Sequence, residues 1–189
     1  MSKRWPLWFG IFVGLTTLSL GFASSSTLNK GLYLATEWTG RVSFPLFIFT
    51  FSISSLATLF PNRLTKALLR QRRWWGLGYA ACFAIHLTVM IVYKWSTGNF
   101  AAVNLVSNRG FLVSILLLAM VFTSNNTAQR VLGRRWKWLH RTGIYALLLQ
   151  YSSGGVAYLL ISLGAAGLRL IAWMQKKRRL KLADGDIVE

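Results

Sequence analysis

The chain has 189 residues, of which 54% are hydrophobic and only 14% are charged, whereas charged residues make up about a quarter of a typical soluble domain. This composition excludes an ordinary water-soluble domain and predicts an integral membrane protein that lies in a lipid bilayer. The net charge of +18 does not indicate a nucleic-acid partner, because the Lys and Arg residues fall in short loops between apolar segments, as on the cytoplasmic side of membrane proteins.

Apolar segments separated by basic or polar loops predict an all-α bundle of six transmembrane helices. At a rise of 1.5 Å per residue, about 20 residues cross the hydrocarbon core, and most of the segments approach that length. The predicted helices cover residues 6–24, 42–60, 74–93, 110–123, 136–151 and 156–173. They form one domain over residues 1–175, which a basic tail over 176–189 follows.

The first segment has two interpretations. It follows Lys3 and Arg4 and ends in small residues, as a cleaved signal peptide does. The apolar run is long for such a peptide, and Gly10 and Gly14 offer a small-xxx-small packing face, so we expect a retained first helix. Residues 27–41, which follow it, are polar enough to predict an exposed loop.

The apolar stretch over residues 138–174 is too long for a single span. The polar and flexible quartet Ser152-Ser153-Gly154-Gly155 near its middle predicts a tight turn. We therefore expect a fifth and a sixth helix on either side of this turn.

The distribution of Lys and Arg predicts the orientation of the bundle. The loops after the second and fourth helices and the C-terminal tail carry five, four and five of these residues, whereas the loops after the first and third helices carry two each. Because positive charge is retained on the cytoplasmic side, both termini are predicted to be cytoplasmic. The bilayer is expected to be the inner membrane of a bacterium.

Carboxylates are scarce, and their absence from the spans excludes several functions. The four acidic residues are Glu37, Asp184, Asp186 and Glu189. Proton-coupled transporters use carboxylates within the membrane, and hydrolysis by paired carboxylates requires two of them, so neither function is expected. The single Cys82 lacks a CxxC partner and is predicted to be a buried packing residue.

The two histidines, His86 and His140, are the strongest candidates for chemistry. An ionisable side chain within the membrane marks a functional site by default, and histidine ligates haem iron. Histidines on different helices suggest a b-type haem, with Arg73 at the cytoplasmic rim as a partner of a propionate. The alternative is that His86 hydrogen-bonds a neighbouring helix and that His140 meets water at the interface.

Three stretches carry a resemblance to a known family: WTGRVSFPLFIFTFSISSLATLFP, RQRRWWGLGYAACFAIHLTVMIVYK and LGRRWKWLHRTGIYALLLQ. The sequence resembles the ferric reductase-like transmembrane domain family, especially its small bacterial members, the haem-binding membrane subunits of periplasmic methionine sulfoxide reductase systems. The resemblance implies six helices, haem b on His86 and His140, and electron transfer across the membrane to a separate acceptor protein. The implied donor is a quinol or a flavin reductase, because the chain has no G-x-G-x-x-G motif of its own.

One position departs from the family pattern. Members of the family usually carry a second histidine about thirteen residues after the first on the fifth helix, and here that position is Ser153. At 1.5 Å per residue, His86 lies ~18 Å from the membrane surface at which its helix begins and His140 only ~5 Å, an offset that disfavours one haem bridging both. We therefore predict one haem rather than two, with His86 as its axial ligand. The alternative is a structural or assembly membrane protein without a cofactor on the same scaffold.

Overall fold

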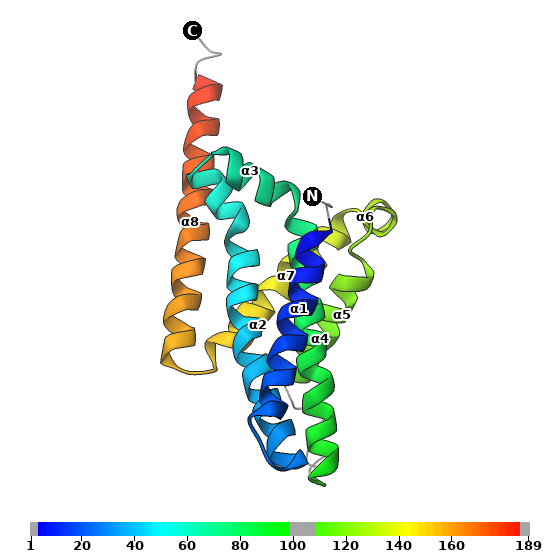
Figure 1. The fold of residues 1–189 in the computed structure, drawn as a ribbon. Coiled ribbons are helices and arrows are strands. Elements are labelled where there is room, and N and C mark those ends of the chain that lie inside the picture. The colour runs from blue at the N-terminus through cyan, green and yellow to red at the C-terminus, as the bar shows by residue number, and fades with distance from the viewer. Residues whose placement is uncertain (1–3, 99–108, 186–189) are drawn as a thin grey trace.

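The structure is a computed structural model of the chain, and it describes residues 4–98 and 109–185. All of the regular secondary structure in these two ranges is helical (Figure 1). The helices are α1 (Trp5–Ala23), α2 (Leu28–Leu59), α3 (Arg63–Arg70), α4 (Arg72–Ser96), α5 (Arg109–Phe122), α6 (Asn126–Leu132), α7 (Arg134–Ser152) and α8 (Val156–Gly185).

Four helices are long and apolar enough to cross a membrane, namely α1, α2, α4 and the Val156–Arg179 part of α8. A fifth span results if α5 and α6, which meet at 106°, count as one broken span. Large apolar side chains such as Trp8, Phe12, Leu149 and Leu160 are exposed on the outside of the bundle, as expected where lipid replaces water. The chain is therefore an integral membrane protein with an all-helical fold.

Helix α2 corrects one prediction, because residues 28–41 are helical and do not form an exposed loop. Although this segment is polar overall, small and apolar residues recur in it at helical spacing and lie on one face of the helix. Leu32, Ala35 and Thr39 on this face are all buried. Ala35 packs against Gly21 of α1. Burial of this face against α1 and α4 stabilises about four further turns beyond the bilayer-length segment.

The C-terminal part of the chain corrects the predicted end of the sixth helix, which the sequence placed at residue 173. Helix α8 continues to Gly185, so most of the predicted tail over 176–189 is a helical extension of the last span. Lys, Arg and Leu are good helix formers, and glycine is a poor one, which explains why the helix passes through the basic run and ends at Gly185. The predicted loop over 94–109 lies mostly outside the described residues.

Two predictions about packing are confirmed. Gly10 and Gly14 are buried against α4, and a Cβ at Gly10 would overlap the backbone of Gly78. Cys82 is fully buried at the same interface. The turn between α7 and α8 is also present, and Gly155 has φ +132°, a conformation that residues with a Cβ rarely adopt.

Helix α2 lies between α8 on one side and the α1–α4 pair on the other, and α7 contacts both α5 and α8 (Figure 1). The short helices α3 and α6 lie at the same end of the bundle. Residues from five helices meet in the core, which contains Phe47, Phe51, Tyr79, Ala80, Val113, Leu117, Leu147, Leu148 and Ala165. This arrangement brings the N-terminal ends of α4 and α7 next to the C-terminal end of α5.

Candidate functional site

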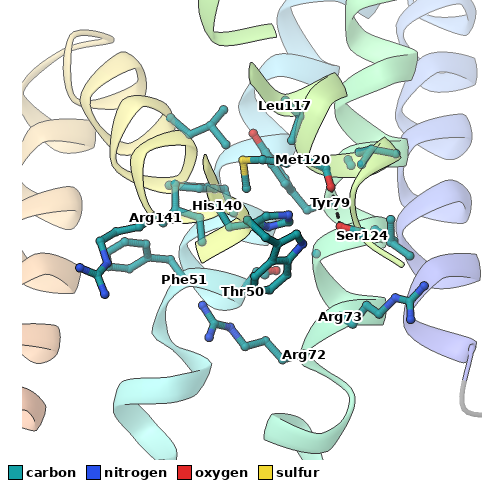
Figure 2. A pocket seen from close by; sticks show the side chains of 18 of the residues that line it. Thr50, Phe51, Arg72, Arg73, Tyr79, Leu117, Met120, Ser124, His140 and Arg141 are labelled. Atoms are coloured by element: carbon teal, nitrogen blue, oxygen red, sulfur yellow. Dashed lines mark hydrogen bonds between the residues drawn. The ribbon is translucent and has the colours of Figure 1, made fainter. Parts of the chain in front are cut away.

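A cavity of about 460 Å³ opens between α2, α4, α5, α6, α7 and α8. Its inner wall is aromatic and apolar, and its rim is polar and basic. Figure 2 shows the residues that surround it, among them Thr50, Phe51, Tyr79, Leu117, Met120, Ser124 and His140. Ligand sites are typically concave, mostly apolar and of about 300–1,000 Å³, with a few polar groups, and this cavity has those features.

His140 lines the cavity and is held by the end of α5. Its Nε2 lies 3.2 Å from the hydroxyl oxygen of Thr123, and its ring packs against Trp136 with the ring centroids 4.2 Å apart. The Trp136 indole N–H in turn donates to the Thr123 carbonyl oxygen at 2.9 Å. These contacts fix the orientation of the imidazole, and Nδ1 has no hydrogen-bond partner among the described residues.

Positive charge surrounds the cavity on several sides. Its lining includes Arg72, Arg73, Lys137, Arg141 and Arg169, and within the described ranges no carboxylate lines it. Arg72, Arg169 and His140 come from three helices and line this one cavity. The cavity is therefore suited to an anionic ligand, because cations withdrawn from water are costly without a counter-charge.

The two arginines at the start of α4 play different parts. Their guanidinium groups point in opposite directions in Figure 2. Arg73, which was predicted as a cofactor-binding residue, is exposed, donates to the side-chain oxygen of Asn126 at 3.3 Å and lies over the ring of Trp74. Arg72 is half-buried, so it reaches further into the protein than Arg73 does.

Sequence reasoning missed Arg169. The stretch over residues 138–174 is almost entirely apolar in sequence, and Arg169 was not predicted as a functional residue, although a charged residue within a span is itself an indication of function. Arg169 lies on α8, lines the cavity, and its guanidinium carbon is 4.8 Å from the ring centroid of Phe51 and 5.1 Å from that of Tyr145.

His86 lies in different surroundings. Its Nδ1 is 3.1 Å from the carbonyl oxygen of Thr36 and 3.2 Å from the hydroxyl oxygen of Thr39. The ring also packs against Gly40 of α2. His86 does not line the cavity, so the structure does not bring the two histidines together around it. Within the described residues, no group of three or more His, Cys, Asp or Glu side chains could hold a metal ion.

Position 153, where the family pattern has a histidine, lies outside the core. Ser153 is exposed in the turn after α7, and its hydroxyl donates to the Gln150 carbonyl oxygen at 2.7 Å. Tyr151 instead faces the bundle, with its hydroxyl 3.3 Å from that of Tyr79 and its ring stacked on Phe47 at 5.3 Å. Aromatic side chains therefore fill the space between α2, α4 and α7 next to this turn.

A bundle of membrane-spanning helices with a histidine at a basic internal cavity defines the class of this protein: an integral membrane protein with a ligand site between its helices. Residues 39–151 match the family described as the ferric reductase like transmembrane component. This match covers more than half of the chain and confirms the resemblance found in the sequence. The chain belongs to the ferric reductase-like transmembrane family.

Curated relatives share one name, the heme-binding subunit MsrQ of protein-methionine-sulfoxide reductase. The chain is 32% identical to MsrQ of Enterobacter sp. (strain 638) over 159 residues, which are 76% of each chain. It is also 32% identical to MsrQ of Cronobacter sakazakii over 160 residues, again 76% of each. MsrQ of Klebsiella pneumoniae (strain 342) is 33% identical over 110 residues, which are 55% of this chain and 54% of the relative. No solved structure matches the chain.

Proposed function

We propose that this protein is a membrane subunit that binds one haem b in the cavity beside His140 and passes electrons from a separate donor to a separate acceptor protein. The observation that carries the proposal is the cavity itself, which combines an oriented imidazole, an apolar wall and a ring of cations. The similarity to haem-binding subunits supports it.

The residues present fit a haem. The porphyrin is flat, apolar and aromatic, and the wall formed by Phe51, Tyr79, Leu117 and Met120 offers matching surfaces. Two propionates make the macrocycle an anion, and the lining is cationic. Arg and carboxylate groups form short, charge-assisted hydrogen bonds, so arginines of the lining, Arg73 among them, would hold the propionates.

His140 would supply the axial nitrogen. A ligating histidine commonly uses its second ring nitrogen to bond a hydroxyl or carbonyl, and this contact fixes the ring. Thr123 makes such a contact here. When bound, haem b supplies one-electron transfer at its iron, and the protein tunes that transfer through the axial ligand, hydrogen bonds and burial. The protein's own part is to orient the imidazole and to supply an apolar, cationic surrounding.

One haem, rather than two, is the stoichiometry that the surroundings favour. A second site of the family type needs the histidine that Ser153 replaces, and Ser153 is exposed. The buried neighbour of this turn is Tyr151, which is hydrogen-bonded to Tyr79. The sequence prediction that His86 is the axial ligand is not tested by these contacts, because its Nδ1 has the carbonyl and hydroxyl partners that a ligating histidine also needs. We place the one haem at His140 instead, because His140 lines the cavity and His86 does not.

The proposed topology has six spans and two cytoplasmic ends in a bacterial inner membrane. Helix α7 has 19 residues, about 28 Å at 1.5 Å per residue, which is long enough to cross a hydrocarbon core. The basic end of the bundle, with Arg72 and His140, then faces the cytoplasm. This is the side on which a quinol or flavin reductase would deliver electrons. A reporter fused after Glu189 that is active only in the periplasm would contradict this orientation.

Visible spectra of purified variants test the proposed function. The wild type, His140→Ala and His86→Ala are to be made with ample haem, purified in mild detergent, and examined for a Soret band and for haem per protein. We expect about one haem b in the wild type, loss of the bands in His140→Ala and their retention in His86→Ala. Each variant removes one imidazole from the bundle, so each controls for the general effect that loss of an imidazole has on folding.

Two outcomes would contradict this proposal in different ways. A colourless wild type would favour the structural or assembly protein without a cofactor. Loss of the bands in His86→Ala alone would instead assign the haem to His86. In that case the cavity beside His140 would serve another anionic ligand.

A further inference from the structure

Arg169 is a charged residue in the middle of a membrane span. It lies 13 residues after Val156, where α8 begins, or about 20 Å along the helix. A guanidinium at this depth is costly unless it is paired or reaches water. The position therefore requires an explanation that packing alone does not provide.

The surroundings of Arg169 satisfy only part of its side chain. Phe51 and Tyr145 present their ring faces to the guanidinium carbon at 4.8 and 5.1 Å, and such cation–π contacts offset part of the desolvation. Nη1, however, is buried and has no hydrogen-bond partner among the described residues. A buried guanidinium N–H without an acceptor is strongly unfavourable.

The nearby charges increase the need for an anion. Arg72 on α4 and Arg169 on α8 both line the cavity, in which, within the described ranges, no carboxylate is found. Withdrawing a cation from water is costly without a counter-charge, and one anion in the cavity would pair with both side chains. The cavity thus contains an anion subsite built from α4 and α8.

We infer that Arg169, together with Arg72, binds an acid group of the ligand in this cavity, which for haem b is a propionate. The inference rests on the proposed function and extends it, because it names the subsite that orients the ligand and the helix that supplies it. Arg169 is then a binding residue that links α8 to the ligand held by His140 on α7.

A phospholipid phosphate is the other source of the same chemistry. A second cavity of about 260 Å³, lined almost entirely by apolar side chains, shares Leu77, Ala80, Leu117 and Val121 with the first. An acyl chain in this second cavity would place a lipid headgroup near the arginines. The experiment must therefore distinguish a propionate from a phosphate.

Haem and haem dimethyl ester, in which both propionates are esterified, make that distinction. The wild type, Arg169→Gln, Arg169→Lys and Lys177→Gln are to be titrated with each compound in detergent, and the phosphate of co-purified lipid is to be measured in the haem-free proteins. Lys177 is exposed on the same helix and lies over Trp173, so its variant controls for the loss of one positive charge.

We expect the wild type to bind haem about 10- to 100-fold more tightly than the ester, as one charged hydrogen bond provides. Arg169→Gln should lose most of this preference, Arg169→Lys should keep part of it, and Lys177→Gln should retain it. An unchanged preference in Arg169→Gln would overturn the inference. Equal affinity of the wild type for haem and for the ester would also overturn it. This second result does not depend on whether any variant folds.

The two remaining outcomes are also decisive. Loss of co-purified lipid phosphate in Arg169→Gln, with the preference for haem over ester intact, would assign the subsite to a phospholipid and overturn the propionate. A wild type that binds neither compound would refute the proposed function itself. That result is distinguishable from failure of the Arg169 subsite alone, in which haem still binds.

Discussion

His140 and His86 are the same residue type on two helices of one bundle, and their surroundings differ in almost every respect. His140 lies at a cavity to which α2, α4, α5, α7 and α8 contribute, with Arg72 and Arg169 nearby. His86 lies in a contact between α4 and α2, where Thr36 and Thr39 bind its Nδ1. One imidazole faces space and positive charge, and the other faces the backbone of a neighbouring helix.

The comparison shows that a buried polar side chain within a membrane can have either of two physical explanations. A ring nitrogen that finds a carbonyl and a hydroxyl is satisfied, and its helix pair is stabilised by an interhelical hydrogen bond. Both rings are oriented through one nitrogen, but His140 also lines the cavity and His86 does not. An oriented ring that lies at a cavity is preorganised for a ligand. Each histidine lies next to a glycine on a packing face, which provides matched substitutions.

Gly143→Val should have the largest effect, and it should act on the cavity. Gly143 lies one turn after His140, and a Cβ there would overlap Met120 Sδ. A valine must displace Met120, which lines the cavity. Overpacking of about 1–3 kcal/mol corresponds to about a 5- to 150-fold loss of haem affinity, measured by titration of the haem-free protein.

Gly164→Val is the control for this variant, because no atom lies within 4 Å of a Cβ at Gly164. It should bind haem as the wild type does. Equal affinity in Gly143→Val and the wild type would show that the cavity beside His140 is not where haem binds.

Gly40→Val should have an intermediate effect, on stability and not on haem. A Cβ at Gly40 would lie 3.0 Å from Cε1 of His86, so a valine pushes the ring away from Thr36 and Thr39. Because this overlap is smaller than the one at Gly143, we expect the free energy of unfolding to fall by about 1 kcal/mol, measured by denaturant titration in mixed micelles. Haem per protein should stay unchanged. A parallel loss of haem would indicate that His86 is an axial ligand.

Ser153→His should have the smallest effect. The substitution restores the histidine of the family pattern, but the side chain lies in an exposed turn and not beside His86. Haem per protein, measured by pyridine haemochrome, should therefore remain about one. A rise to two haems would show that the turn can rearrange to place residue 153 in the bundle, and it would revive the two-site arrangement.

Much of the fold follows from local patterns. The apolar lengths of α1, α4 and α8, the small-residue face at Gly10 and Gly14, the buried Cys82 and the turn before Gly155 were all predicted and are present. Each depends on residues within a few turns of one another, because helix formation and hydrophobic length are local properties. The family could also be recognised from short motifs around His86 and His140.

Other features depend on contacts between distant segments. Residues 28–41 look polar in sequence, and only their burial against α1 and α4 makes them helical. In the sequence, Arg169 is an isolated charge. In the structure, its guanidinium lies over the rings of Phe51 and Tyr145, and it lines the cavity together with Arg72. The sequence predicted His86 as the axial ligand because it lies in the middle of the helix that carries the strongest family resemblance, and the position of the cavity beside His140 could not be predicted from that pattern.

By itself, the sequence determined that this chain is a basic, carboxylate-poor membrane bundle of the ferric reductase-like family with two histidines. Only the tertiary structure decided that His140 lines the cavity and that His86 is hydrogen-bonded to residues of α2. The same holds for Arg169 and Arg72, which line one cavity from different helices. The physical reason is that helical periodicity specifies which face of a helix a residue occupies. What that face meets is determined by how five helices pack together.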